Sequence, residues 1–134
     1  MGSTSRPPPV AHFSSRSYTY MQHTSVDVPH FDASEWTFLR GALSTVDRPY
    51  HFVDFFHHNI GTSHVVHHLF SRLPHYHAAE ATEALKRVLG SYYQYDPTPV
   101  FQAFWREYPK CRFVAPVAGA GGNGLLWFRP SFKK

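Results

Sequence analysis

The sequence predicts a mainly α-helical fold that ends in a short β-hairpin. Strong helix formers fill residues 78–89 and stop at Gly90, as in a helix with a glycine terminator. Prolines and capping residues divide the preceding chain into segments of helical length. Near the end of the chain, two apolar runs flank a glycine-rich loop, a pattern typical of paired strands. At 134 residues, the chain has the length of a single domain.

The first two helical regions are defined by caps and prolines. Asp32 or Ser34 can cap a helix that runs to about Val46, where Asp47-Arg48-Pro49 ends it. A second helical region covers about residues 49–71, because proline is accepted in the first turn of a helix.

Two further helix boundaries follow from breakers. The second region is expected to break at Gly61-Thr62-Ser63, since a glycine inside a helix costs about 1 kcal/mol. Thr62 or Ser63 can then cap a new helix, which Pro74 prevents from continuing. Pro97 or Thr98 begins another helix, which ends near residue 108.

The two ends of the chain differ in character. Cys111 to Val117 and Leu125 to Phe128 are predicted to be strands, joined by the glycine-rich loop 119–124. Residues 1–17 form a polar leader rich in proline and serine, without the apolar core of a secretory signal, and we expect it to be disordered. We therefore expect one structural unit over residues 18–134.

Composition restricts the possible partners. The net charge is +4 and no run of Lys or Arg exceeds two residues, so the sequence does not indicate a nucleic-acid partner. A mildly basic face fits anionic lipid headgroups or an acidic electron-donor protein. Aromatic residues make up 17% of the chain, which predicts either surfaces that contact lipid or protein, or an aromatic core. The single Cys111 cannot form an internal disulfide and favours a cytosolic location.

Two uncharged stretches are too polar or too broken to be membrane spans. Residues 55–71 hold five histidines together with Asn, Gly, Thr and Ser. Residues 113–128 are interrupted by Pro116 and four glycines. The sequence therefore predicts no transmembrane helix.

The most informative motif is His64-Val65-Val66-His67-His68. On a helix, steps of about 100° place His67 about 60° to one side of His64 and His68 about 40° to the other. Three imidazoles on one helical face predict a metal site, because imidazole is the commonest metal ligand in proteins. The alternative is a helix whose histidines are solvated or hydrogen-bonded.

The sequence around this motif is similar, in order and nearly without gaps, to a known family. The relevant segments are residues 58–70 and 73–81 around the motif, 19–24, 29–31, 35–43 and 45–48 before it, and 90–93, 104–106 and 126–129 after it. Together they resemble the C-terminal part of membrane-bound fatty acid desaturases of the microsomal Δ12 (oleate) type. His64, His67 and His68 correspond to the third histidine box of that family.

The resemblance implies a non-haem di-iron enzyme that uses O2 to desaturate an acyl lipid, with cytochrome b5 as its electron donor. It also implies a location at the cytosolic face of the endoplasmic reticulum membrane. Carried over residue by residue, His64, His67 and His68 are expected iron ligands, and His23 in Gln22-His23-Thr24 is a fourth candidate. The following Ser25-Val26 departs from the family pattern, which usually has His or Asp and then Pro.

Three further residues are expected near the ligands, where they would orient them. They are His57, Asn59 and His77. On a continuous helix His57 lies within about 20° of His64, two turns earlier. A solvated His57, a turn role for Asn59 and simple helix-entry packing for His77 are the alternatives.

The two earlier histidine boxes of the family and its hydrophobic spans do not occur in this sequence. We therefore expect a C-terminal part of a Δ12 desaturase that has no activity by itself. One alternative is a non-catalytic module that binds full-length desaturases or the membrane surface, and another is a soluble histidine-rich metal-binding protein. An ω-3 or bifunctional activity also remains open, because sister desaturases share the third box.

Overall fold

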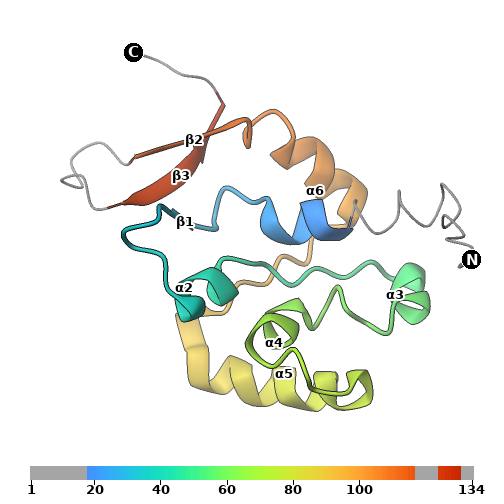
Figure 1. The fold of residues 1–134 in the computed structure, drawn as a ribbon. Helices are drawn as coiled ribbons and strands as arrows, with labels where there is room; N and C mark the ends of the chain where they lie inside the picture. Colours follow the sequence, from blue (N-terminus) through green and yellow to red (C-terminus); the bar gives the residue numbers. More distant parts are fainter. Residues whose placement is uncertain (1–17, 117–123, 131–134) are drawn as a thin grey trace, which may run out of the picture.

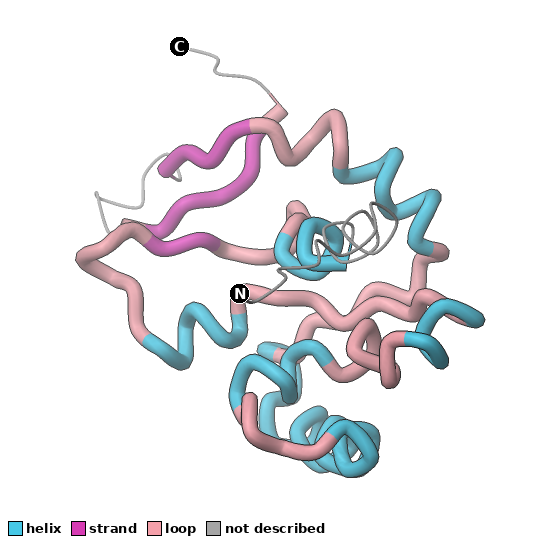
Figure 2. Tube along the Cα trace, turned by 45° about the vertical axis from the view of Figure 1, so that its right-hand side comes forward, coloured by secondary structure: helices cyan, strands magenta, loops and turns pink. Residues whose placement is uncertain are grey.

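The structure is a computed structural model that describes residues 18–116 and 124–130. The predicted leader 1–17 lies outside the described residues. The described chain is mostly helical, with one small antiparallel sheet, so the predicted class is confirmed. Figure 1 shows the sheet at one end of the molecule, with α4 and α5 on the opposite side. A helical segment at residues 18–23, which the sequence did not predict, lies between them (Figures 1 and 2).

The sheet contains the predicted hairpin and one additional strand. β2 (Phe113–Pro116) pairs antiparallel with β3 (Leu125–Arg129), with Val114 opposite Phe128. The pairing is as predicted, but β2 begins two residues later than the expected start at Cys111. The unpredicted strand is β1 (His30–Phe31), which pairs with the other edge of β3, giving the order β1-β3-β2. A strand of two residues is too short to show the alternation of apolar and polar residues by which strands are predicted from a sequence.

The first predicted helix is shorter than expected. α2 spans Phe38–Leu43 and is capped by Thr37, whose hydroxyl accepts from the Arg40 N–H at 3.3 Å. Asp32, one of the predicted caps, instead closes a turn by accepting from the Ser34 N–H at 2.9 Å. The helix does not reach Val46, because the Val46 N–H donates to the Gln22 carbonyl at 2.9 Å and so joins the 18–23 segment.

The second helical region breaks at the predicted place, but the break is longer. α3 spans Phe52–Phe56 and α4 spans His64–Leu69, so residues 57–63 are not helical. His58 and Asn59 adopt positive φ values of 54° and 57°, which no α-helix accommodates. Ser63 occupies the predicted cap position, but its hydroxyl donates to the Asn59 carbonyl and does not cap α4.

The later helices agree with the prediction except at their first residues. α5 spans His75–Leu89, starting directly after Pro74 and three residues before the expected start. It ends at Gly90, which has a φ of 53° and leads into the 3-10 turn η1 (Gly90–Tyr92). α6 spans Val100–Glu107 and starts late, because the Asp96 carboxylate accepts from the Thr98 N–H and holds the preceding residues in a turn.

The interior is unusually polar. A small apolar cluster of Tyr18, Met21, Tyr50 and Ala103 lies beside side chains of Gln22, Asp47, Arg48 and Glu107 that are fully buried. Cys111 is buried and carries a free thiol. Many aromatic side chains are exposed instead, notably Phe52, Phe55, Phe56, Phe101 and Trp105. Over the described ranges 18–116 and 124–130, no helix has the length and hydropathy to cross a membrane.

Candidate metal centre

Three histidine side chains converge on one point. His64 and His68 lie four residues apart on the same face of α4, and His23 ends the 18–23 helical segment. The Nε2 atoms lie 3.3 Å apart for His23 and His64, 3.1 Å for His23 and His68, and 3.2 Å for His64 and His68. We call these residues the three-histidine cluster.

The spacing of these nitrogens fits one metal ion. A metal that binds three imidazoles at about 2.0–2.1 Å, with angles from about 90° to 110°, separates their nitrogens by about 2.8–3.4 Å. All three measured separations fall inside this range. The donor set is three neutral nitrogens, which suits iron, zinc, copper or nickel.

Burial keeps the cluster in the neutral form that metal binding requires. Desolvation lowers the pKa of His64 to about 3, helped by the neighbouring rings of His68 and His23. Desolvation, followed by the ring of His23, lowers the pKa of His68 to about 4. The pKa of His23 is also lowered by burial, although the Ser44 carbonyl partly opposes this. Near neutral pH, no proton therefore competes with a metal at these nitrogens.

The backbone fixes the orientation of His23. Its Nδ1 lies 3.5 Å from the Ser44 carbonyl oxygen at the end of α2, so Nδ1 carries the proton and donates. The Nε2 lone pair is then free to face the cluster. A pocket of about 230 Å³ beside the ring is lined by His23, His30, Phe31, Trp36, Gly41 and Ser44.

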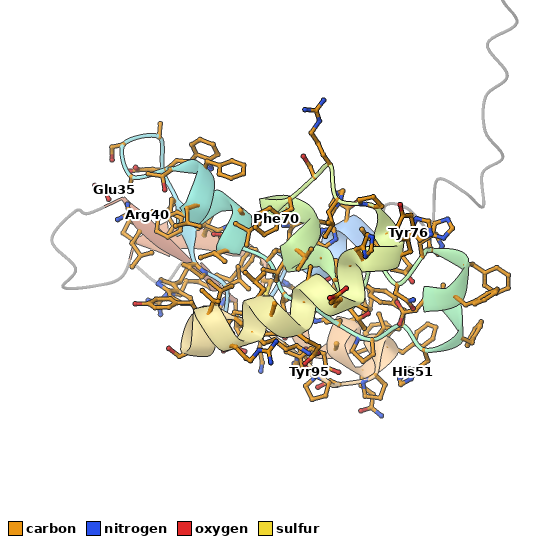
Figure 3. All side chains as sticks on the ribbon, turned by 90° about the horizontal axis from the view of Figure 1, so that it is seen from below. Glu35, Arg40, His51, Phe70, Tyr76 and Tyr95 are labelled. Carbon is orange, nitrogen blue, oxygen red and sulfur yellow. The ribbon has the colours of Figure 1, made fainter. Side chains whose placement is uncertain are left out.

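α4 is fixed by its opposite face. Val65 and Val66 are buried with about 1% of their surfaces exposed, so the helix cannot rotate without exposing apolar side chains. α4 packs against α2 and α5. In Figure 3, which views the molecule from below relative to Figure 1, α5 runs across the front with α4 beside it.

The structure places His67 outside the cluster. Its ring centroid lies 5.7 Å from that of His64 and 5.8 Å from that of His68, and its side chain is exposed. It lines a different cavity of about 340 Å³ together with His57, His58 and His75. On the helix, His67 lies about 60° to one side of His64 and His68 about 40° to the other, and His23 approaches on the side of His68.

The three residues expected to orient the ligands have other contacts. His57 packs against Tyr18, with ring centroids 4.5 Å apart. Asn59 forms the turn before α4, where its carbonyl accepts from the Ser63 hydroxyl at 2.9 Å. His77 is exposed on α5, 3.8 Å from the Glu80 carboxylate. Within the described chain, none of the three makes a hydrogen bond to the three-histidine cluster.

Three residues beside the cluster had not been identified from the sequence. His30 lines the pocket next to His23, and its Nε2 is buried without a hydrogen-bond partner among the described residues. Asp47 and Arg48 are expected from the sequence to end a helix, yet both are fully buried. The sequence signal that could have identified them is a pair of adjacent opposite charges between Val46 and Pro49, since charged residues are buried mainly when they are paired.

Comparison with known proteins identifies the family. The fatty acid desaturase family model matches residues 7–99. The Delta(12)-acyl-lipid-desaturase of Punica granatum is 54% identical over 111 residues, which are 83% of this chain and 29% of the relative. The omega-6 fatty acid desaturase, endoplasmic reticulum isozyme 1, of Glycine max is 50% identical over 114 residues, 85% of this chain and 30% of the relative.

A relative with a different named activity is equally similar. The oleoyl-12-hydroxylase of Ricinus communis is 50% identical over 114 residues, again 85% of this chain and 30% of the relative. The chain thus spans about three tenths of the length of the curated relatives that it matches. No solved structure gives a significant match. From the family model and from relatives that are 50–54% identical over more than four fifths of its length, the chain belongs to the fatty acid desaturase family.

Proposed function

We propose that this chain is the histidine-box part of a Δ12 acyl-lipid desaturase, an enzyme that converts an oleoyl group to a linoleoyl group. The observation that carries the proposal is the convergence of His23, His64 and His68, with Nε2 atoms 3.1–3.3 Å apart. The names of the Punica granatum and Glycine max relatives support an acyl-lipid or fatty acid substrate and the Δ12 or omega-6 position. The Delta(12)-oleate desaturase of Trichosanthes kirilowii supports an oleoyl group.

The three-histidine cluster would hold one iron of a di-iron centre. Bound iron would supply the O2-dependent oxidising power that removal of hydrogen from an unactivated methylene group requires. His67 faces the neighbouring cavity, so we assign it to the second iron. One histidine does not complete that second site, and the chain alone should therefore be inactive.

The residues of this chain prepare the site for the metal. Burial keeps the imidazoles of His64 and His68 unprotonated, so a metal binds without first displacing protons. The Ser44 carbonyl holds the proton of His23 on Nδ1 and leaves Nε2 as a ligand. All three rings are half-buried.

The surface suits a membrane location. Phe52, Phe55 and Phe56 on α3 are 73–81% exposed, and the chain carries a net charge of +4. Exposed aromatic and basic residues favour the interface of a membrane with anionic lipids. We propose the cytosolic face of the endoplasmic reticulum, with cytochrome b5 as the electron donor and an acyl lipid as the substrate.

The first test is turnover in a full-length context. The matching segment of the Punica granatum desaturase would be replaced by this chain, expressed in yeast that lacks linoleate, and fatty acids measured by gas chromatography. We expect His23→Ala, His64→Ala, His67→Ala and His68→Ala each to abolish the diene product at normal protein levels. His57→Ala should retain substantial activity, and equal loss at His57 would refute the ligand assignment.

The same assay distinguishes hydroxylation from desaturation. The similarity to the Ricinus communis oleoyl-12-hydroxylase makes hydroxylation the specific alternative. A hydroxylated C18 product in place of linoleate would favour that alternative. The unfused chain should give neither product, and a clear diene peak from the chain alone would contradict its assignment as an incomplete enzyme.

The second test is metal binding by the chain itself. Three imidazoles without further partners should bind divalent metals in the Irving–Williams order, with Cu, Ni or Zn preferred to Fe(II). Calorimetric titration with Zn(II) and Fe(II) should show one weak site that His64→Ala removes and His77→Ala leaves unchanged. Two tight iron-selective sites would show that this chain already contains a complete di-iron centre.

A further inference from the structure

The two sides of the three-histidine cluster meet at two adjacent residues that are both fully buried, Asp47 and Arg48. Asp47 contacts the helix that carries His64 and His68, and Arg48 contacts the segment that carries His23. We infer that Asp47 and Arg48 are positioning residues, which together set the distance between His23 and the two histidines of α4.

Asp47 fixes the first turn of α4. Its Oδ1 accepts from the Val65 N–H at 2.9 Å, while Ser63, at the cap position, makes no side-chain capping bond. Its Oδ2 accepts from the hydroxyl of Tyr93. A side chain 18 residues away thus provides the acceptor that a helix start needs. Because His64 directly precedes Val65, this bond fixes the place where the first ligand leaves the backbone.

Arg48 fixes the end of the 18–23 segment. Its guanidinium donates to the Met21 carbonyl at 2.6 Å and to the Thr24 carbonyl at 3.5 Å, on either side of His23. The other side of the guanidinium is held by Asp96 at 3.0 Å and Glu107 at 3.9 Å. The backbone around His23 is therefore bound to a guanidinium group that two carboxylates hold in place from its other side.

The backbone between the two sides is also tied down. The Arg48 N–H donates to the Gly61 carbonyl at 2.8 Å, and the Gln22 side-chain amide donates to the same oxygen at 3.1 Å. The Asp47 N–H donates to the Gln94 carbonyl at 3.0 Å. Residues 47–48 therefore cannot move without breaking hydrogen bonds to both α4 and the 18–23 segment.

This geometry gives a selective prediction. His64 and His68 lie one turn apart on the same helix, so the backbone of α4 sets their separation directly. Both distances to His23 instead join two separate segments, which residues 47–48 connect. Loss of either positioning residue should disturb the two contacts of His23 and leave the His64–His68 contact intact. General destabilisation would not separate these contacts.

The test uses the full chain and two readouts, one of which needs no metal. Ring-to-ring NOEs would be measured between His23 and His64 and between His23 and His68, whose centroids lie 5.2 and 4.8 Å apart, and between His64 and His68 at 4.7 Å. The second readout is titration with Co(II) by visible absorption. The metal readout rests on the proposed function, and the NOE readout does not.

In Asp47→Ala and Arg48→Lys, the NOEs from His23 should weaken or vanish while the His64–His68 NOE remains. Co(II) affinity should fall by about 10- to 100-fold, the usual cost of losing a residue that orients ligands. Asp47→Asn keeps an oxygen acceptor for the Val65 N–H and should recover most of both signals. Asp27→Ala and Arg87→Lys change exposed side chains and serve as matched controls that should behave as the parent chain.

The inference is overturned if a folded Asp47→Ala or Arg48→Lys retains all three NOEs and the parent Co(II) affinity. Arg48→Lys preserves the buried positive charge, so it decides the question if Asp47→Ala does not fold. A parent chain that shows the NOEs but binds no Co(II) would refute the proposed metal function and leave the positioning role to be judged from the NOEs.

Discussion

The metal-free chain should lose stability as the pH falls from about 7 to 5, because the folded chain keeps His64 neutral whereas the unfolded chain protonates it. Its pKa is about 3 in the folded chain, against about 6.5 when unfolded. Between these values the unfolded state holds one more proton, so acid favours unfolding. The contribution of His64 is fully present above pH 6.5 and is lost progressively as the pH falls toward 3.

The magnitude follows from that difference. One extra proton in the unfolded state changes the free energy of unfolding by about 1.4 kcal/mol per pH unit, so His64 costs about 2 kcal/mol at pH 5. His68, whose pKa is lowered to about 4, adds a loss of up to about 2 kcal/mol over the same range. The total of about 2–4 kcal/mol is a large share of the 5–15 kcal/mol that typically stabilises a domain.

Urea unfolding followed by circular dichroism, with a chelator present, would measure this loss at both pH values. His64→Gln removes the titrating ring, and the difference between the two pH values should shrink by about 2 kcal/mol. His77→Gln changes an exposed histidine and should leave the difference unchanged. An equal loss of stability in the parent chain and in His64→Gln would refute the reasoning.

Three further substitutions test the packing around the site, all by urea unfolding. Gly61→Ala should cost about 1–3 kcal/mol, because a Cβ there would lie 2.6–2.7 Å from side-chain and backbone atoms of its neighbours. Val66→Ala should cost about 1–3 kcal/mol, whereas Val88→Ala, at a position 82% exposed, should stay within about 0.5 kcal/mol. Tyr93→Phe leaves a buried carboxylate oxygen without its donor and should cost about 1–3 kcal/mol, and Tyr92→Phe should cost little. Equal effects at a buried site and its exposed control would contradict the packing described here.

Features determined by local sequence were predicted best. The α5 helix with its Gly90 terminator, the break before His64 and the β2–β3 pairing all follow from caps, breakers and propensities within a few residues. The early end of α2 could not be predicted, because the bond that stops it comes from Gln22, far away in the sequence. Short elements such as β1 lack enough residues to show a period.

The site was predictable only in part, for the same reason. The spacing of His64, His67 and His68 predicted imidazoles on one helical face, and the family resemblance added His23 as a candidate. Helical geometry alone gave His67 nearly the same claim as His68, since their offsets from His64 differ by only about 20°. What separates them is the side from which His23 approaches α4, and that depends on the buried charge of Arg48.

The long sequence separation between His23 and the two histidines of α4 means that a bound metal ion would also affect folding. His23 lies 41 residues from His64 and 45 from His68, so one ion bound to all three would close a long loop of the polypeptide. An ion held by all three rings binds fully only when that loop is already closed, whereas a pair of ligands on one helix would need no loop closure. Because the helix and the loop both exist only in the folded chain, metal uptake and folding become one equilibrium, and the melting temperature would report the free metal concentration around the protein.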